Sequence, residues 1–189
     1  MTIERERQPI KIVKFIPESH KILSDGFLVY IPTVQSIATL REDGRKFSSI
    51  WHKNYPDFEN KTSRLSEIAI PKNPKQFFLP NSNFKTLSEQ EEMIAKYSEE
   101  LLRKIPGIKA ILGEVPDYLE LTILHFMKTQ ETLFGEKYYN CFTRTKTQTA
   151  DSRSTLVGRS ATGFNIVRWP NDEGHYSLFA APLIVPDEK

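Results

Sequence analysis

The clearest pattern in the sequence is an amphipathic helix over residues 89–104. Ser88 and Glu91 form an S-x-x-E capping box. In such a box, at the start of a helix, the side chain of each residue accepts a hydrogen bond from the backbone amide of the other. Pro106 and Gly107 end the helix. Apolar residues recur between these signals at helical spacing, at Met93, Ile94, Tyr97, Leu101 and Ile105. A helix with one apolar stripe has to pack on another element, and we expect that element to be a sheet.

Strand-like segments dominate the rest of the chain. β-Branched and aromatic residues predict strands over 10–16 and 26–31, with a turn at 24–26 between them, and further strands over 34–40 and 45–52. Together these segments predict an antiparallel meander in the N-terminal quarter. The C-terminal half predicts strands over 137–147, 155–158, 164–169 and 176–185, the last bulged or at an edge because it contains Pro182.

Residues 117–129 are ambiguous between strand and helix. Leu119, Leu121 and Ile123 alternate as in a strand, whereas Leu124 and Met127 would continue a helix. We favour the strand. The expected fold class is therefore α+β, with antiparallel sheet or sheets, one well-defined amphipathic helix and a single domain over 1–189, a length that suits one domain.

A proline-rich excursion covers residues 54–86. Four prolines leave little regular structure there beyond a short strand over 65–70. A loop of this length is unusual inside a compact domain, so it is either functional or held against a partner. Phe77, Phe78 and Leu79 form an apolar run within it; we favour a place in the core over a docking face for another protein.

The charge is unevenly distributed, although the net charge is only +2. Residues 134–169 are basic, whereas 88–120 and 170–189 are acidic. This pattern allows a local positive surface, but an ordinary mixed surface explains it equally well.

The strand over 138–146 carries the strongest functional signal. Alternation places aromatic side chains and then cations on one face, and single-stranded nucleic acid is bound by stacking on rings and pairing with cations. Further cations and a tryptophan follow along the chain. The RNA-binding candidates are Tyr138, Phe142, Arg144, Lys146, Arg153, Arg159, Arg168 and Trp169. The alternative is that the aromatic residues belong to the core and the cations only face solvent.

A weaker candidate is a metal-dependent nuclease site. Asp57 and Glu59 would hold Mg²⁺ and Lys61 would stabilise charge on the phosphate, although a charged loop explains the three residues fully. The four histidines form no metal-ligand spacing, and residues 158–163 lack the lysine of a phosphate-binding loop. We therefore expect no catalytic residue, metal or cofactor.

Composition indicates the expected compartment. The first residues lack the apolar run of a secretory signal, and no stretch reaches the roughly 18 apolar residues of a membrane helix. Cys141 is the only cysteine, and we read it as a small buried hydrophobe in a reducing environment. These features predict a cytoplasmic protein with no membrane partner.

The chain resembles one protein family in size, composition and strand character over most of its length. It opens with strands ending in FLVYIP (27–32), continues into the proline-rich excursion and closes with a β segment. In these respects it is similar to the seventh, accessory subunit of the archaeal Cmr-type (type III-B) CRISPR RNA-silencing complex. The resemblance implies a non-catalytic, homodimeric subunit attached to a crRNA-guided complex that cleaves RNA in antiviral defence. It transfers no functional residue. The alternatives are a stand-alone single-stranded nucleic-acid-binding protein, the nuclease, and a pure protein-interaction subunit.

Overall fold

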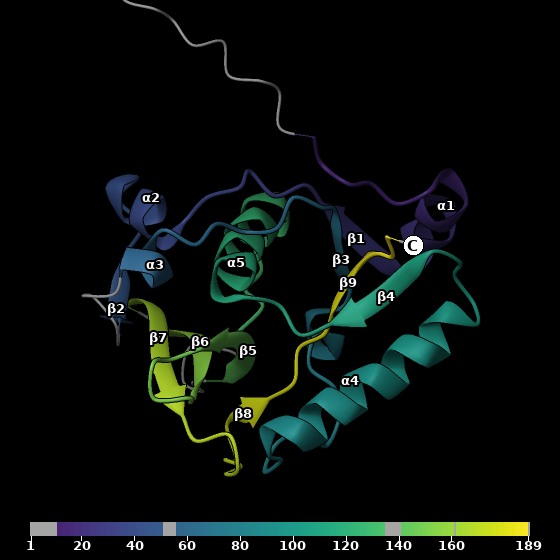
Figure 1. Ribbon diagram of the computed structural model, residues 1–189. Coiled ribbons are helices and arrows are strands. Elements are labelled where there is room, and N and C mark those ends of the chain that lie inside the picture. The colour runs from purple at the N-terminus through teal and green to yellow at the C-terminus, as the bar shows by residue number, and fades with distance from the viewer. Residues whose placement is uncertain (1–10, 51–55, 135–140, 161, 189) are drawn as a thin grey trace, which may run out of the picture.

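The computed structural model describes residues 11–50, 56–134, 141–160 and 162–188, which form two sheets with several helices (Figure 1). The predicted α+β class is confirmed. Helix α5 (Val115–Thr129) packs against both sheets, and one hydrophobic cluster joins Ile70 and Val185 of the first sheet to Tyr118 of α5 and to Ile166 of the second.

The first sheet is antiparallel, in the order β1-β3-β9-β4. Its strands are β1 (Phe27–Tyr30), β3 (Ile68–Pro71), β9 (Leu183–Pro186) and β4 (Ile108–Ile111). Every residue of β3 and β9 is buried. Ile68 and Ile70 belong to the cluster around α5, whereas Ala69 belongs to the cluster on the opposite face. Burial on both faces explains why these strands are continuous apolar runs rather than alternating ones.

The second sheet is mixed, in the order β2-β7-β6-β5-β8. Its central strands β7 (Gly163–Trp169), β6 (Ser154–Ser160) and β5 (Phe142–Gln148) are antiparallel. The edge strands β2 (Phe47–Ile50) and β8 (Leu178–Phe179) pair parallel with their neighbours. The expectation of purely antiparallel pairing is therefore correct for the first sheet and for the centre of the second.

The predicted amphipathic helix is present as α4 (Leu87–Leu102), which packs on the first sheet beside β4. Its capping box uses Thr86 and Glu89 rather than Ser88 and Glu91. Thr86 N donates to Glu89 Oε2 at 2.8 Å, and Glu89 N donates to Thr86 Oγ1 at 3.3 Å. The helix therefore begins one half-turn earlier than predicted.

The predicted N-terminal meander is wrong. Residue 10 lies outside the described residues, and the described remainder of this segment, 11–16, contributes a single bridge, from Val13 to Ser66. Residues 17–26 form helix α1 (Pro17–Gly26) instead of ending in a turn. The predicted strand over 34–40 is replaced by helix α2 (Ile37–Glu42), which Ser36 caps by accepting from Thr39 N at 3.1 Å. The strands β1 and β2 are present but lie in different sheets. A short apolar segment is compatible with a helix or with a strand, and here the N-cap and the sheet neighbours decide between the two.

The strand prediction for 117–129 is also wrong, because this segment is all of α5 except its first two residues. The N-terminal half of α5 is buried on all sides, so its apolar residues show no helical stripe. Two signals did mark a helix. Pro116 lies in its first turn, and Glu114 with Asp117 forms a capping box.

The segment 176–185 is two strands, β8 and β9, in different sheets, and Pro182 separates them. The prediction of one bulged or edge strand is therefore wrong, since β9 is an interior strand. Proline is tolerated here because it precedes the strand.

The proline-rich excursion is part of the core. Besides β3 it contains helix α3 (Pro56–Glu59) and the 3₁₀ turn η1 (Pro74–Gln76); residues 54 and 55 lie outside the described residues. Phe77 is fully buried and packs in the main cluster, and Leu79 is also buried. The core interpretation of this apolar run therefore agrees with its burial, while Phe78 is half-buried at the surface of the cluster.

Buried carboxylates of α5 hold two of the segments that run between the sheets, one after β1 and one before β3. Glu120 accepts hydrogen bonds from Thr33 and Ser63, and Asp117 accepts from Arg64 N at 2.7 Å. These bonds satisfy polar groups that would be costly if left unpaired. Within the described part of the chain, no helix combines the length and the apolar character needed to cross a membrane.

Candidate nucleic-acid interface

The structure divides the predicted RNA-binding residues between two faces of the second sheet. Register places Phe142 opposite Gly158 and Arg144 opposite Leu156. Leu156 in turn lies opposite Val167, which shares a face with Trp169. Phe142, Arg144 and Trp169 therefore share the face turned away from α5. Arg159 directly follows Gly158 and Arg168 directly precedes Trp169, so alternation along the strands places both arginines on the other face, which is the α5 face. Tyr138 lies outside the described residues.

Arg144 is fully buried, so the prediction that it contacts phosphate is wrong. Its guanidinium donates to the Pro170 carbonyl at 2.9 Å and to the Glu173 carbonyl. Burial lowers the pKa of Arg144 to about 10. The side chain is an anchor for the turn after β7, and its charge is enclosed by the fold.

Three other predicted cations differ in their pairing. Arg153 Nε lies 3.4 Å from Asp151 Oδ2, and Arg168 forms an ion pair with the same carboxylate. The hydrogen bond that Thr149 donates is the largest cause that lowers the pKa of Asp151, and the lower pKa keeps this carboxylate charged. Lys146 is exposed on β5. The charges of Arg153 and Arg168 are therefore partly neutralised, whereas Lys146 faces solvent on the side away from α5.

Trp169 is half-buried within a run of aromatic rings. Its ring centroid lies 5.0 Å from that of His175, which lies 4.3 Å from that of Tyr176. Tyr176 is 64% exposed. Sequence reasoning did not include His175 and Tyr176, because they join Trp169 only when the turn 170–174 folds back.

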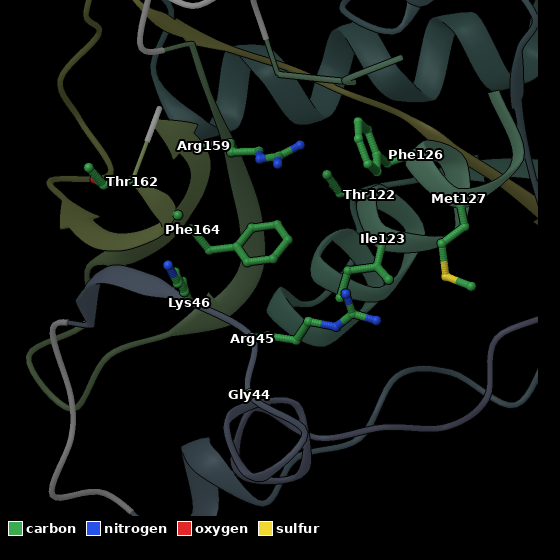
Figure 2. A pocket seen from close by; sticks show the side chains of 11 residues that line it. Gly44, Arg45, Lys46, Thr122, Ile123, Phe126, Met127, Arg159, Thr162 and Phe164 are labelled. Atoms are coloured by element: carbon green, nitrogen blue, oxygen red, sulfur yellow. The ribbon is translucent and has the colours of Figure 1, made fainter. Parts of the chain in front are cut away.

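Arg159 lies in a cationic pocket of about 310 Å³ on the α5 face of the sheet. Figure 2 shows Arg159 and Arg45 extending toward α5 from opposite sides, with the Phe164 ring between them. The lining comes from the link between α2 and β2, from α5 and from the β6–β7 hairpin. Its residues are Gly44, Arg45, Lys46, Thr122, Ile123, Phe126, Met127, Arg159, Thr162, Gly163 and Phe164.

The pocket has an apolar floor and an apolar rim on one side. Phe164 is buried in the main cluster, and Ile123 packs against that cluster. Phe126 is 38% exposed and Met127 is 64% exposed. The Arg159 guanidinium lies 5.3 Å from the Phe126 ring centroid, a cation–π distance. A flat apolar group can therefore contact rings and methylenes in the same pocket that presents positive charge.

No acid among the described residues lies within ion-pair distance of the cations of the pocket. None of the described residues that line it is acidic. Arg45, Lys46 and Arg159 form no ion pair with any described residue, and Arg45 and Lys46 are exposed. Sequence reasoning missed Arg45, Lys46, Phe126 and Met127. Their only sequence signal is an Arg-Lys pair after a Gly turn, and three distant segments must meet to form the pocket.

The predicted nuclease residues are not assembled into one site. Glu59 Oε1 pairs with Arg41 at 2.7 Å, whereas Lys61 Nζ pairs with Glu114 at 3.0 Å. Asp57 is exposed. Across the residues that the structure describes, no three or more His, Cys, Asp or Glu side chains are grouped as metal ligands.

Cys141 is half-buried beside an apolar hollow of about 520 Å³ that Phe78 and Leu133 also line. Burial raises the pKa of the Cys141 thiol. Less of the thiol is then ionised at neutral pH, which disfavours a nucleophilic role.

Comparisons with known proteins gave no match, whether against family models, curated proteins or solved structures. Function has to be inferred from the chain's own residues.

Proposed function

We propose that this protein is a non-catalytic binding protein for single-stranded RNA and that the cationic pocket is its principal contact. The observation that carries the proposal is the combination in one pocket of Arg45, Lys46 and Arg159 with an apolar floor and no acidic lining residue. Single-stranded nucleic acids present both phosphates and unstacked base faces, and proteins bind them with cations and aromatic rings.

The size of the pocket favours a single strand. Its volume of about 310 Å³ is at the lower end of small-ligand sites, which span about 300–1,000 Å³. One unstacked base fits such a site, whereas a base inside a duplex would first have to leave its stack. We assign the base to the side of Phe126 and Phe164, and the backbone to the side of Arg45 and Lys46.

The decisive experiment is fluorescence anisotropy with a labelled single-stranded RNA over a series of salt concentrations. We expect the double variant Arg45→Ala/Lys46→Ala to bind at least tenfold more weakly. Its log–log salt slope should be smaller by about 1.4, since each phosphate contact on a single strand contributes about 0.7.

A matched control removes the same charge elsewhere. Arg103→Ala/Lys104→Ala also replaces two adjacent exposed cations, at the end of α4, and should keep the affinity within about twofold. Equal losses in the two double variants would mean that net charge alone governs binding. Absence of RNA binding by the wild-type protein would remove the proposal.

The place of this protein in an assembly is a separate part of the proposal. Its support is the resemblance to the Cmr-type accessory subunit, which implies a homodimer attached to a crRNA-guided complex. Affinity purification from the native cell, with sequencing of bound RNA and mass spectrometry of bound proteins, tests it. Recovery of Cmr subunits with crRNA would support the assignment, and recovery of RNA without them would favour a stand-alone RNA-binding protein.

A further inference from the structure

A second hollow, of about 420 Å³, adjoins the cationic pocket. It is lined by Arg41, by Arg45 and by strand β2, which includes Ser48 and Ser49. Arg45 also lines the cationic pocket. Arg41 is engaged by Glu59, so Arg45 supplies the unpaired charge that the two hollows share.

Three hydroxyl groups meet between these hollows. Ser48 Oγ lies 2.7 Å from Thr162 Oγ1 and 3.0 Å from Ser160 Oγ, and Ser160 Oγ lies 3.0 Å from Thr162 Oγ1. Ser48 lines the second hollow and Thr162 lines the pocket. We call Ser48, Ser160 and Thr162 the hydroxyl cluster. All three hydrogen bonds are exposed, so a ligand can reach the cluster from solvent.

The chemistry of the hydroxyl cluster suits a phosphate group. Each hydroxyl has one rotatable donor, and the fold directs three donors from two strands and a hairpin to one point. Among the described residues these donors bond only to neighbouring hydroxyls or to the Gly163 carbonyl, and they can reorient toward an anion. Arg45 and Lys46 line the same pocket as Thr162, and the Arg45 guanidinium is directed toward α5 (Figure 2).

A terminal phosphate matches this arrangement better than an internal one. A phosphomonoester presents three free oxygens and carries a charge of about −1.5 to −2 at neutral pH. An internal phosphodiester carries a single charge and has two free oxygens. Three hydroxyl donors and two unpaired cations therefore correspond to the monoester in both donor number and charge.

We propose that the hydroxyl cluster, with Arg45 and Lys46, binds the terminal phosphate of an RNA strand whose last nucleotide occupies the cationic pocket. This inference rests on the proposed RNA-binding function and specifies which part of the RNA the site recognises. The phosphate belongs to either the 5′ or the 3′ end, because both ends offer the same chemistry.

The test compares three RNAs of one ten-nucleotide sequence: one with a 5′-phosphate, one with a 3′-phosphate and one with hydroxyls at both ends. Each RNA is labelled at an internal position, and binding is followed by anisotropy. We expect one phosphorylated RNA to bind about tenfold more tightly than the unphosphorylated RNA, since charged hydrogen bonds are lost with the phosphate. The combined variant Ser48→Ala/Ser160→Ala, whose two residues do not line the cationic pocket, should abolish this preference while retaining binding of the unphosphorylated strand. Ser88→Ala, an exposed serine on α4, is the control and should retain the preference.

The outcomes separate this inference from the function on which it rests. Equal wild-type affinity for all three RNAs would overturn the terminal-phosphate site and leave RNA binding intact. A preference that survives in the combined variant would also overturn it, because the phosphate would then be recognised elsewhere. Failure of every RNA to bind would remove the proposed function together with the inference. The comparison of RNA ends uses the wild-type protein, so it does not depend on the folding of any variant.

Discussion

Arg144 and Arg159 lie on neighbouring strands of one sheet, yet their environments are opposite. Arg144 is fully buried and donates to carbonyls of the turn 170–173. Arg159 stacks over Phe126 at the side of an open pocket in which no acid pairs with it. Arg144 stabilises the fold because backbone carbonyls accept from it, whereas the half-buried Arg159 lies over a ring and lines a pocket that is open to a ligand. Sequence alone assigned the same RNA-binding role to both.

The largest expected effect is on stability, from Arg144→Ala. The substitution removes the donors of two partly buried hydrogen bonds and leaves a cavity at a fully buried side chain, so we expect it to lower the free energy of unfolding by about 3 kcal/mol. Urea denaturation measures this change. If the loss were no greater than a typical surface value of about 0.5 kcal/mol, Arg144 would not be the anchor that the structure indicates.

Arg159→Ala should affect binding instead of stability. Loss of one phosphate or stacking contact predicts about tenfold weaker RNA binding, or about 1.4 kcal/mol. The free energy of unfolding should change by about 0.5 kcal/mol or less. Arg168→Ala is the matched control, because Arg168 lies on the same face but pairs with Asp151. Equal loss of affinity in both variants, measured by anisotropy, would argue against the pocket as the principal contact.

A smaller effect is expected from His125 of α5, which is buried and directly precedes the exposed Phe126. Tyr30 Oη lies 2.7 Å from His125 Nδ1, and burial lowers the pKa of His125, while Glu131 and Lys128 act on it in opposite directions. The unfolded chain therefore binds a proton more readily than the folded protein. Stability should be complete above about pH 6.5 and should fall as the pH is lowered through the folded-state pKa.

Urea denaturation at pH 7.5 and pH 5.0 measures this contribution, with His125→Gln as the comparison. The wild-type protein should lose more stability between these pH values than the variant does. The same loss in both proteins would assign the pH dependence to other groups.

The smallest effect is expected from Lys146→Ala. Lys146 is exposed on β5, two residues from Arg144 and on the face of the sheet opposite the pocket. Neither the free energy of unfolding, within about 0.5 kcal/mol, nor RNA affinity, within about twofold, should change. A large loss of affinity would instead place the RNA on the face that carries Phe142 and Trp169.

Some of the candidate site could be predicted from the sequence and some could not. Arg159 was among the predicted cations, because a basic stretch is visible in the order of residues. Arg144 was equally visible, but its burial depends on a turn that begins 26 residues later and folds over it. Arg45, Lys46 and Phe126 carry little signal of their own, and contacts between distant segments bring them to Arg159.

The sequence by itself determined the α+β class, the helix α4 and several strands, because local propensity, spacing and capping act over a few residues. Only the tertiary structure decided that α5 is a helix, that β1 and β2 belong to different sheets, and which arginine faces a pocket. The physical reason is that burial and strand partners depend on segments far apart in the chain. The N-terminal half of α5 is buried on every side because both sheets pack against it, and no local period records that arrangement.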